Sequence, residues 1–371
     1  MNCKQTIQGN PSSILVIAMR YLGDVLLTTP LIHSLKQAYP HARIDVLVYG
    51  NTAAMLEGNP DIHQIITTPN RPKFADYRYL LRQLFRRYDL AVATQAGDRP
   101  FLYTMLAASW RVAVVPKKNA TGWWKRFFVQ HWVEFDDNTH TVLQHLKLLD
   151  SINVPRCFSL IPPTVSDTRQ MAEQFPFLSD NTSYVVLHSH PQWTYKQWTV
   201  VAWIEVGHYL NDLGLKLVLS GGPAQAEIDY VAAIQRQLPE GTINLAGQVT
   251  LAQLAKIIAQ AKLYIGPDTG ITHLAAATGV PVIALFGPTN PVKWAPFPYA
   301  YQANVNPFNI KGDQHVNNIY LVQGVGDCVP CDLEGCDRHQ QSRSQCLDTL
   351  SSNSIKELVS KLLNKQMKPL N

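Results

Sequence analysis

The feature that most constrains the fold is a repeated alternation between short β-branched runs and longer helical patterns. In the first half of the chain the runs lie at residues 14–19, 43–49, 64–68, 89–94 and 111–115. The same rhythm restarts at residues 184–189 and continues at 215–222, 242–247, 263–268 and 281–287. Such alternation predicts parallel strands joined by crossover helices. We therefore expect an α/β protein with two doubly wound, Rossmann-like sheets in series.

A segment rich in proline and serine, SINVPRCFSLIPPTVSD, separates the two series. The 371 residues also exceed the size that one core usually supports, roughly 250 residues. We predict an N-terminal domain over 1–165, a C-terminal domain over 166–350 and a terminal helix over 351–371. That helix has an apolar face, and the first domain is the candidate surface for it. Because ligands of open α/β sheets bind at the carboxyl ends of the strands, two facing sheets would place the active site in the cleft between them.

Two helix starts have the sequence of a capping box. Thr250 with Gln253 precedes the apolar segment LAQLAKIIAQAK, and Ser354 with Glu357 opens the terminal helix. Both are predicted to fix the first turn of their helix.

The charge of the chain is uneven. Residues 1–165 hold 18 Lys and Arg against 11 Asp and Glu, net +7, whereas the remainder holds 14 against 16, net −2. The basic half is predicted to meet an anion, and a phosphorylated small molecule, an anionic lipid headgroup or a solvated surface without a partner all agree with it. No nucleic-acid partner is expected, since the chain has no helix-turn-helix, zinc-finger or RNP pattern. The lack of a signal sequence or an apolar run of about 18 residues predicts a cytoplasmic protein whose membrane contact is peripheral.

The first strand-to-helix turn, RYLGDVLLTTP, holds a carboxylate at the carboxyl end of the first strand. Gly23 would let the backbone turn tightly, and Asp24 occupies the position of an N-cap. An aspartate there could equally serve as a general base for a sugar hydroxyl. Arg20 and Gly23 are expected to contact the molecule that carries this hydroxyl, the acceptor.

The second candidate segment is DTGITHLAAA at residues 268–277, directly after a predicted strand. The free amides of its helix start form an anion site, and Asp268 can accept hydrogen bonds from sugar hydroxyls. Thr269 and Gly270 would let a phosphate approach the backbone. The alternative is a purely structural turn in which His273 is a buried imidazole. The segment is neither GxGxxG nor a Walker loop, which argues against dinucleotide binding and ATP hydrolysis.

The remaining candidates for binding a phosphorylated ligand follow other predicted strands of the second half. Ser189 and His190 come after the strand at 184–189, and Lys196 in TYKQW could offset the charge of a leaving diphosphate. Gly222 with Glu227, and Gly247, stand at turns that could hold a nucleoside, although a glycine alone is an ordinary turn residue.

Aromatic and basic residues alternate in WWKRFF at 123–128, after Lys117 and Lys118. This pattern suits a membrane interface or an anionic glycolipid. Burial of the aromatic rings, with the cations reaching outward, is the alternative.

Four cysteines lie within nineteen residues: Cys328, Cys331, Cys336 and Cys346. A zinc site is conceivable, but the irregular spacing also agrees with reduced thiols or a local disulfide.

Through RYLGDVLLTTPLIHSLKQAYPHARIDVLV and GPDTGITHLAAATGVPVIALFGPTNPVKWAPF, the chain resembles glycosyltransferase family 9, the heptosyltransferases of lipopolysaccharide core synthesis. The likeness covers nearly the whole chain. GDVLLTTP, the spacing to VLVYGNT and FGPTNPVKW are most similar to the type III members, which add a branching third heptose to the second heptose.

The resemblance implies a GT-B fold and an inverting single displacement with no metal or other cofactor. The implied donor is ADP-L-glycero-β-D-manno-heptose, and the implied acceptor is the anionic lipopolysaccharide inner core on heptosylated Kdo-lipid A, at the cytoplasmic face of the inner membrane. Asp24 matches the family's base, Lys196 the lysine on the donor phosphates and Asp268 the residue that holds the heptose. Thr269, Gly270 and His273 match the pyrophosphate loop, whereas Ser189 and His190 depart from the threonine-rich stretch of type I members.

Three alternatives stay open on the sequence: a type I or II heptosyltransferase, another GT-B enzyme such as a sugar-nucleotide epimerase or a UDP-sugar transferase, and an inactive nucleotide-sugar-binding scaffold. Retention of Asp24 and Lys196 together favours an enzyme.

Overall fold

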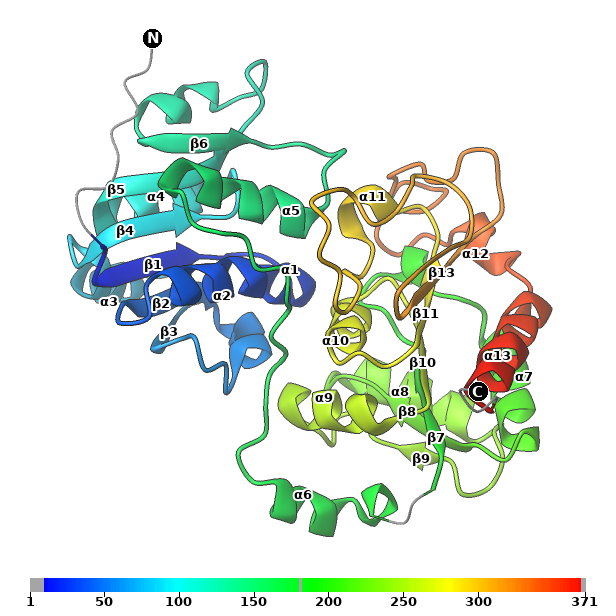
Figure 1. Ribbon diagram of the computed structural model, residues 1–371. Helices are drawn as coiled ribbons and strands as arrows, with labels where there is room; N and C mark the ends of the chain where they lie inside the picture. The colour runs from blue at the N-terminus through cyan, green and yellow to red at the C-terminus, as the bar shows by residue number, and fades with distance from the viewer. Residues whose placement is uncertain (1–9, 180–181, 368–371) are drawn as a thin grey trace. The chain divides into compact units, whose positions relative to one another are not determined.

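The computed structural model describes residues 10–179 and 182–367, which divide into two compact α/β units (Figure 1). The first unit comprises Met1–Ser166 and Tyr299–Pro307, and the second comprises Asp167–Pro298 and Phe308–Asn371. The division after Ser166 falls within the proline- and serine-rich segment. The predicted bounds placed Tyr299–Pro307 in the second domain, whereas in the structure this segment belongs to the first unit.

A six-stranded sheet in the order β3-β2-β1-β4-β5-β6 forms the centre of the first unit, with every pair parallel. Its strands are β1 (Ser13–Ile17), β2 (Arg43–Tyr49), β3 (Gln64–Thr68), β4 (Tyr88–Ala93), β5 (Ala108–Val115) and β6 (His131–Glu134). Its helices are α1 (Leu22–Leu26), α2 (Thr29–Ala38), α3 (Phe74–Leu84), α4 (Asp98–Ala107) and α5 (Thr141–Leu146), with 3₁₀ turns η1 (Gly50–Leu56), η2 (Trp123–Phe127) and η3 (Lys147–Ile152). The edge strand β6 was not predicted, because its residues are half exposed and form no apolar run.

A seven-stranded sheet in the order β12-β13-β11-β10-β7-β8-β9 forms the centre of the second unit. Its strands are β7 (Tyr184–His188), β8 (Lys216–Ser220), β9 (Ile243–Asn244), β10 (Leu263–Pro267), β11 (Val282–Phe286), β12 (Gln314–Val316) and β13 (Ile319–Gln323). Its helices are α6 (Thr168–Gln174), α7 (Val200–Asp212), α8 (Gln225–Gln235), α9 (Leu251–Gln260), α10 (Gly270–Ala277), α11 (Pro291–Trp294), α12 (Gln345–Asp348) and α13 (Ser352–Met367), with 3₁₀ turns η4 (Pro176–Leu178) and η5 (Thr194–Lys196). The hairpin of β12 with β13 was not predicted, and its edge strand β12 runs antiparallel.

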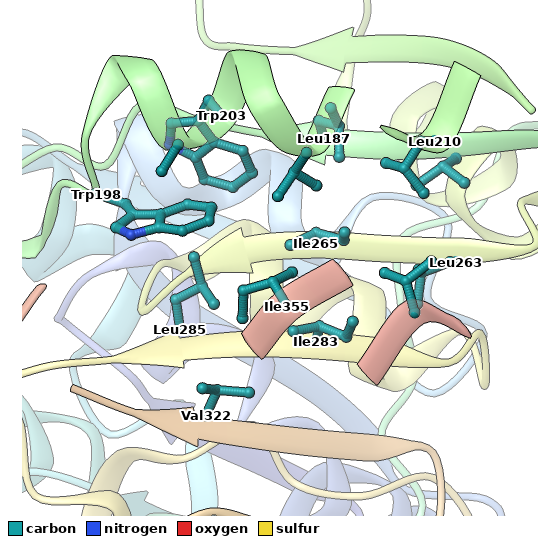
Figure 2. Close-up of a cluster of buried hydrophobic side chains, with 14 of the residues drawn as sticks. Leu187, Trp198, Trp203, Leu210, Leu263, Ile265, Ile283, Leu285, Val322 and Ile355 are labelled. Atoms are coloured by element: carbon teal, nitrogen blue, oxygen red, sulfur yellow. The ribbon is translucent and has the colours of Figure 1, made fainter. Parts of the chain in front are cut away.

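The terminal helix α13 belongs to the core of the second unit. Ile355 and Val359 are fully buried there with Trp203 and Leu210 of α7 (Figure 2). The expectation that this helix packs on the first domain is therefore wrong, because its apolar face fills the groove beside α7 on the same sheet.

The capping box of Thr250 and Gln253 is confirmed at the start of α9, where each side chain bonds the backbone amide of the other residue. The box of Ser354 and Glu357 is wrong. The helix already begins at Ser352, and the hydroxyl of Ser354 donates instead to the carbonyl of Ser351.

Candidate active site

The candidate residues of the second unit line one edge of its sheet. The strands β10, β7, β8 and β9 are neighbours in that order, and the first three run parallel in register. The residues that follow their carboxyl ends are Asp268 after β10, Ser189 and His190 after β7, Gly222 after β8, and Gly247 after β9. Parallel strands present these ends at a common edge, so residues far apart in sequence form one row there.

A partly buried ion pair lies at one end of this row. The ammonium of Lys196, on η5, lies 2.6 Å from a carboxylate oxygen of Asp268. Both side chains are largely removed from water. The pair fixes a cation beside the strand end where α10 starts, and such a cation can stabilise an anionic ligand.

The start of α10 is shaped by its N-cap. The side chain of Thr269 accepts a hydrogen bond from the amide of Thr272. In an α-helix the first amides have no intrahelical partner, so Gly270 and Ile271 carry the remaining donors of this turn. The prediction placed the free amides within residues 269–273. The structure leaves the amides of Gly270 and Ile271 for a ligand, and two such amides can bind an oxyanion.

Three buried polar atoms in this row have no hydrogen-bond partner within the protein: the Oγ of Ser189, the Nδ1 of His190 and the Nδ1 of His273. A buried polar atom without a partner is costly, so such atoms mark positions where a ligand can supply the missing hydrogen bond. Burial lowers the pKa of His273 to about 4, against a smaller raising effect of Asp268. Burial likewise lowers the pKa of His190. Both imidazoles are therefore neutral near pH 7.

His188 belongs to the core and not to this group of unpartnered polar atoms. Its side chain is buried, and its Nδ1 lies 3.0 Å from the hydroxyl of Ser220 on β8. Burial lowers the pKa of His188 to about 4. This histidine ties β7 to β8 below the strand ends.

Gly222, Glu227 and His190 form a second group along the row. A Cβ on Gly222 would lie 2.7 Å from a carboxylate oxygen of Glu227, so the glycine gives that carboxylate its position. The negative charge of Glu227 raises the pKa of His190, which opposes the larger effect of burial. Gly247 has a φ of +70°, a backbone conformation that favours glycine.

The turn that carries Lys196 is braced by the cysteine-rich segment. The amide of Thr194 donates to the carbonyl of Gln340 at 3.0 Å, and the hydroxyl of Ser344 donates to the carbonyl of Tyr195 at 2.6 Å. These supporting residues were not found from the sequence. In the sequence, only the closely spaced cysteines on either side of these residues set the segment apart.

In the first unit, Asp24 lies at the carboxyl end of β1. The helix α1 begins at Leu22 after the N-cap Tyr21, so Asp24 stands inside the first turn and the prediction of an N-cap aspartate is wrong. Its side chain is mostly buried, and the Nε of Arg20 lies 3.9 Å from one of its oxygens. Gly23 is helical, so its role is not to provide a left-handed turn.

Two residues that the sequence did not single out hold this turn in place. The ring of His145, on α5, lies with its Nδ1 3.3 Å from the carbonyl of Leu27 at the end of α1. Gln95, after β4, accepts a hydrogen bond from the amide of Met19. Asp24 is therefore carried by a helix whose two ends are both supported.

The structure also places the aromatic segment and the cysteines. The rings of Trp123, Trp124, Phe127 and Phe128 are exposed and Lys125 is buried, which overturns the alternative of buried rings with outward cations. Cys328, Cys331, Cys336 and Cys346 are free thiols. Within residues 10–179 and 182–367, no three His, Cys, Asp or Glu residues are arranged to hold a metal ion. No helix in that part of the chain is long and apolar enough to cross a membrane.

The chain is similar in sequence to the proteins of one family. Residues 78–320 match the model of glycosyltransferase family 9 (heptosyltransferase). The chain is 31% identical over 293 residues to lipopolysaccharide heptosyltransferase 3 of Escherichia coli, covering 75% of this chain and 84% of that protein.

Two solved structures share the fold. The glycosyl transferase family 9 structure from Veillonella parvula superposes with a TM-score of 0.75 at 20% identity, covering 95% of this chain and 97% of that one. The E. coli ADP-heptose lps heptosyltransferase II superposes with a TM-score of 0.72 at 20% identity, covering 96% and 100%. These likenesses identify the GT-B fold, with two Rossmann-like domains. The protein is a glycosyltransferase and belongs to glycosyltransferase family 9, the heptosyltransferases.

Proposed function

We propose that this enzyme transfers L-glycero-D-manno-heptose from ADP-heptose to the inner core of lipopolysaccharide, as the branching third heptose on the second. The observation that carries the proposal is the Lys196–Asp268 pair at the start of α10, next to the unpartnered Nδ1 of His273. The 31% identity to a heptosyltransferase 3 supports the type.

The second unit is proposed to bind the donor. Lys196 and the amides of Gly270 and Ile271 would meet the diphosphate, since they combine a fixed cation with the positive end of α10. Asp268 would accept hydrogen bonds from heptose hydroxyls. The neutral ring of His273 and the row from Ser189 to Gly247 supply the remaining polar contacts.

Asp24 is proposed to be the general base. Its carboxylate takes the proton of the acceptor hydroxyl while that oxygen attacks the anomeric carbon on the face opposite ADP. The bond from the anomeric carbon to the diphosphate oxygen breaks in the same step, and the configuration inverts. Arg20, 3.9 Å from Asp24, would hold the carboxylate and contact the anionic acceptor.

The departing diphosphate gains negative charge in this step. The proposal assigns its stabilisation to Lys196 and the helix-start amides, so turnover should persist in the presence of EDTA. We also propose that the enzyme works in the cytoplasm, peripherally at the inner membrane, because the acceptor is attached to a lipid.

The proposal is tested with the purified protein, ADP-heptose and lipopolysaccharide from a strain that lacks this gene. Mass spectrometry should show one added heptose on the wild-type reaction, and NMR of the product should place it as a branch on the second heptose. Addition to a heptose-free core would identify a type I activity instead. A modified sugar nucleotide with no transfer would identify an epimerase, and bound donor with no product of either kind would identify a scaffold.

A further inference from the structure

The large exposed hydrophobic side chains of the described residues are concentrated in one stretch of the first unit. Of nineteen such residues, eleven lie between Phe74 and Trp132. On α3, Phe74, Tyr77 and Leu81 follow one another at helical spacing and are exposed, beside the buried Leu80 and Leu84. The others in this stretch are Tyr79, Phe85, Leu102, Trp123, Trp124, Phe127, Phe128 and Trp132.

The positive charge of the chain is concentrated in the same stretch. Residues 71–128 hold 12 Lys and Arg against 3 Asp and Glu, net +9, while the rest of the chain holds 20 against 24, net −4. Arg78, Arg82 and Arg86 are exposed on or beside α3, and Lys117 and Lys118 are exposed before η2. The overall charge of +5 therefore arises from this stretch alone.

These elements form one layer on one face of the six-stranded sheet. Leu80 and Leu84 of α3, Phe101 of α4 and Val129 after η2 all belong to a single buried cluster on that sheet. Phe101 also meets Trp124 edge to face, with ring centroids 5.7 Å apart. The exposed hydrophobic side chains of α3, α4 and η2 are thus carried by one continuous buried cluster.

The segment η2 is held with its rings outward by a buried lysine. Lys125 is 3% exposed, and its ammonium lies 2.6 Å from Asp98 and 3.0 Å from the carbonyl of Ala96. Phe127, two residues on, is 70% exposed. Burying a lysine while exposing the neighbouring aromatic residues is the reverse of ordinary surface packing, so the exposure of these rings is built into the fold.

This layer reaches the edge of the sheet where Asp24 lies. Ala96 follows β4, and η2 follows β5, and these strands continue the order from β1. The bond from Lys125 to Ala96 therefore pins η2 at the carboxyl edge of the sheet. A surface that docks there would lie beside the edge that carries the proposed base.

We propose that the exposed face of α3, α4 and η2 is a docking surface for an anionic lipid bilayer. Tryptophan and phenylalanine insert at the level of lipid headgroups, and clustered arginine and lysine are attracted to anionic lipids. The net charge of +9 in residues 71–128 matches that partner, and the same face of a second copy of the chain would repel it. The inference rests on the proposed function, because an acceptor attached to lipid gives this edge a reason to lie at a membrane.

Flotation with vesicles of phosphatidylcholine, with and without about 30% phosphatidylglycerol, tests the surface. The variant Trp123→Ser/Phe127→Ser removes two rings that contact each other. It leaves Trp124, the ring that packs on the buried Phe101, unchanged. We expect its partition onto anionic vesicles to fall by about tenfold or more, and salt at about 0.5 M to weaken wild-type binding similarly. The control Val201→Ser/Val325→Ser removes two comparably exposed residues, 64% and 68%, from the second unit and should bind as wild type.

Transfer to an acceptor oligosaccharide freed of its lipid separates this inference from the proposed function. The Trp123→Ser/Phe127→Ser variant should keep wild-type rates on that soluble acceptor and lose rate on acceptor in vesicles. Failure of wild-type transfer to either acceptor, with vesicle binding intact, counts against the proposed function alone. Equal vesicle binding by the variant and the wild type would overturn the docking surface. So would a wild-type dimer in sedimentation that the variant converts to a monomer without changing vesicle binding.

Discussion

The carboxyl edges of the two sheets are built from similar strands but have opposite chemistry. The edge of the second unit carries a row of buried polar groups, including the Lys196–Asp268 pair and the unpartnered nitrogen of His273. The edge of the first unit carries Asp24 with Arg20 at 3.9 Å, and beside it an exposed aromatic and basic face. Under the proposed function, the edge of the second unit binds a small anionic donor, and the edge of the first unit acts on a substrate attached to a surface.

The difference shows how one architecture is divided between two tasks. A donor that must be held until it reacts requires many fixed polar contacts, because each contact restricts its position. A base requires one carboxylate in a supported turn, as α1 provides. The following predictions separate binding from proton transfer along this division.

The largest effect is expected for Asp24→Asn. The substitution keeps the size of the side chain and removes its basicity, so kcat should fall by about 10²- to 10⁴-fold while donor affinity stays unchanged. Transfer assays and calorimetry with ADP-heptose measure the two quantities. Asp61→Asn, which changes another buried carboxylate of the first unit, is the matched control and should retain transfer. Loss of donor affinity in Asp24→Asn would contradict the division between the units.

The next effect is expected for Lys196→Ala. The variant removes the cation next to Asp268, so donor affinity and turnover should fall together, with kcat/KM lower by about 10²-fold. Lys262→Ala is the control, because Lys262 is exposed immediately before β10, the strand that Asp268 follows. Unchanged kinetics in Lys196→Ala would remove this lysine from the site.

The two sheets could be predicted because their inner strands are fully buried and therefore read as continuous apolar runs. Eight of these runs, at β1, β2, β4, β5, β7, β8, β10 and β11, became central strands. The half-exposed edge strands β6 and β12 and the inner strand β13 were not predicted. Nor was the return of Tyr299–Pro307 to the first unit, which depends on tertiary contacts alone.

The candidate site shows the same limit. The position of Asp268 and Thr269 is local to one strand-to-helix turn, so the sequence places it. The support of the Lys196 turn by Gln340 and Ser344 joins residues nearly 150 positions apart, for which a single sequence has no signal. The burial of Lys125 between exposed rings contradicts residue-type preference, so it could only be seen in the fold.

The third prediction concerns pH and tests the buried histidines of the second unit. His188 and His273 have pKa values lowered by burial from 6.5 to about 4, so the unfolded chain binds protons first as the pH falls. Their contribution to stability is complete above pH 6.5 and is lost as the pH falls from 6.5 toward 4. Urea unfolding should show the free energy of unfolding decreasing by up to about 1.4 kcal/mol per pH unit for each histidine. His188→Gln should reduce that slope, and an equal slope in the variant would mean that His188 is not held neutral.

The smallest effect is expected for Gly222→Ala, which tests how far the donor row extends. The new Cβ would meet the carboxylate end of Glu227 at 2.7 Å, and this flexible end can move, so the fold should remain stable. The displaced carboxylate would no longer face His190, and donor affinity should fall by about two- to tenfold. Gly50→Ala is the control, because a Cβ there meets nothing within 4 Å. Unchanged donor affinity in Gly222→Ala would mean that the donor contacts extend no further along this edge than His190. The donor contacts of the second unit would then be limited to the group around Asp268 and to Ser189 and His190.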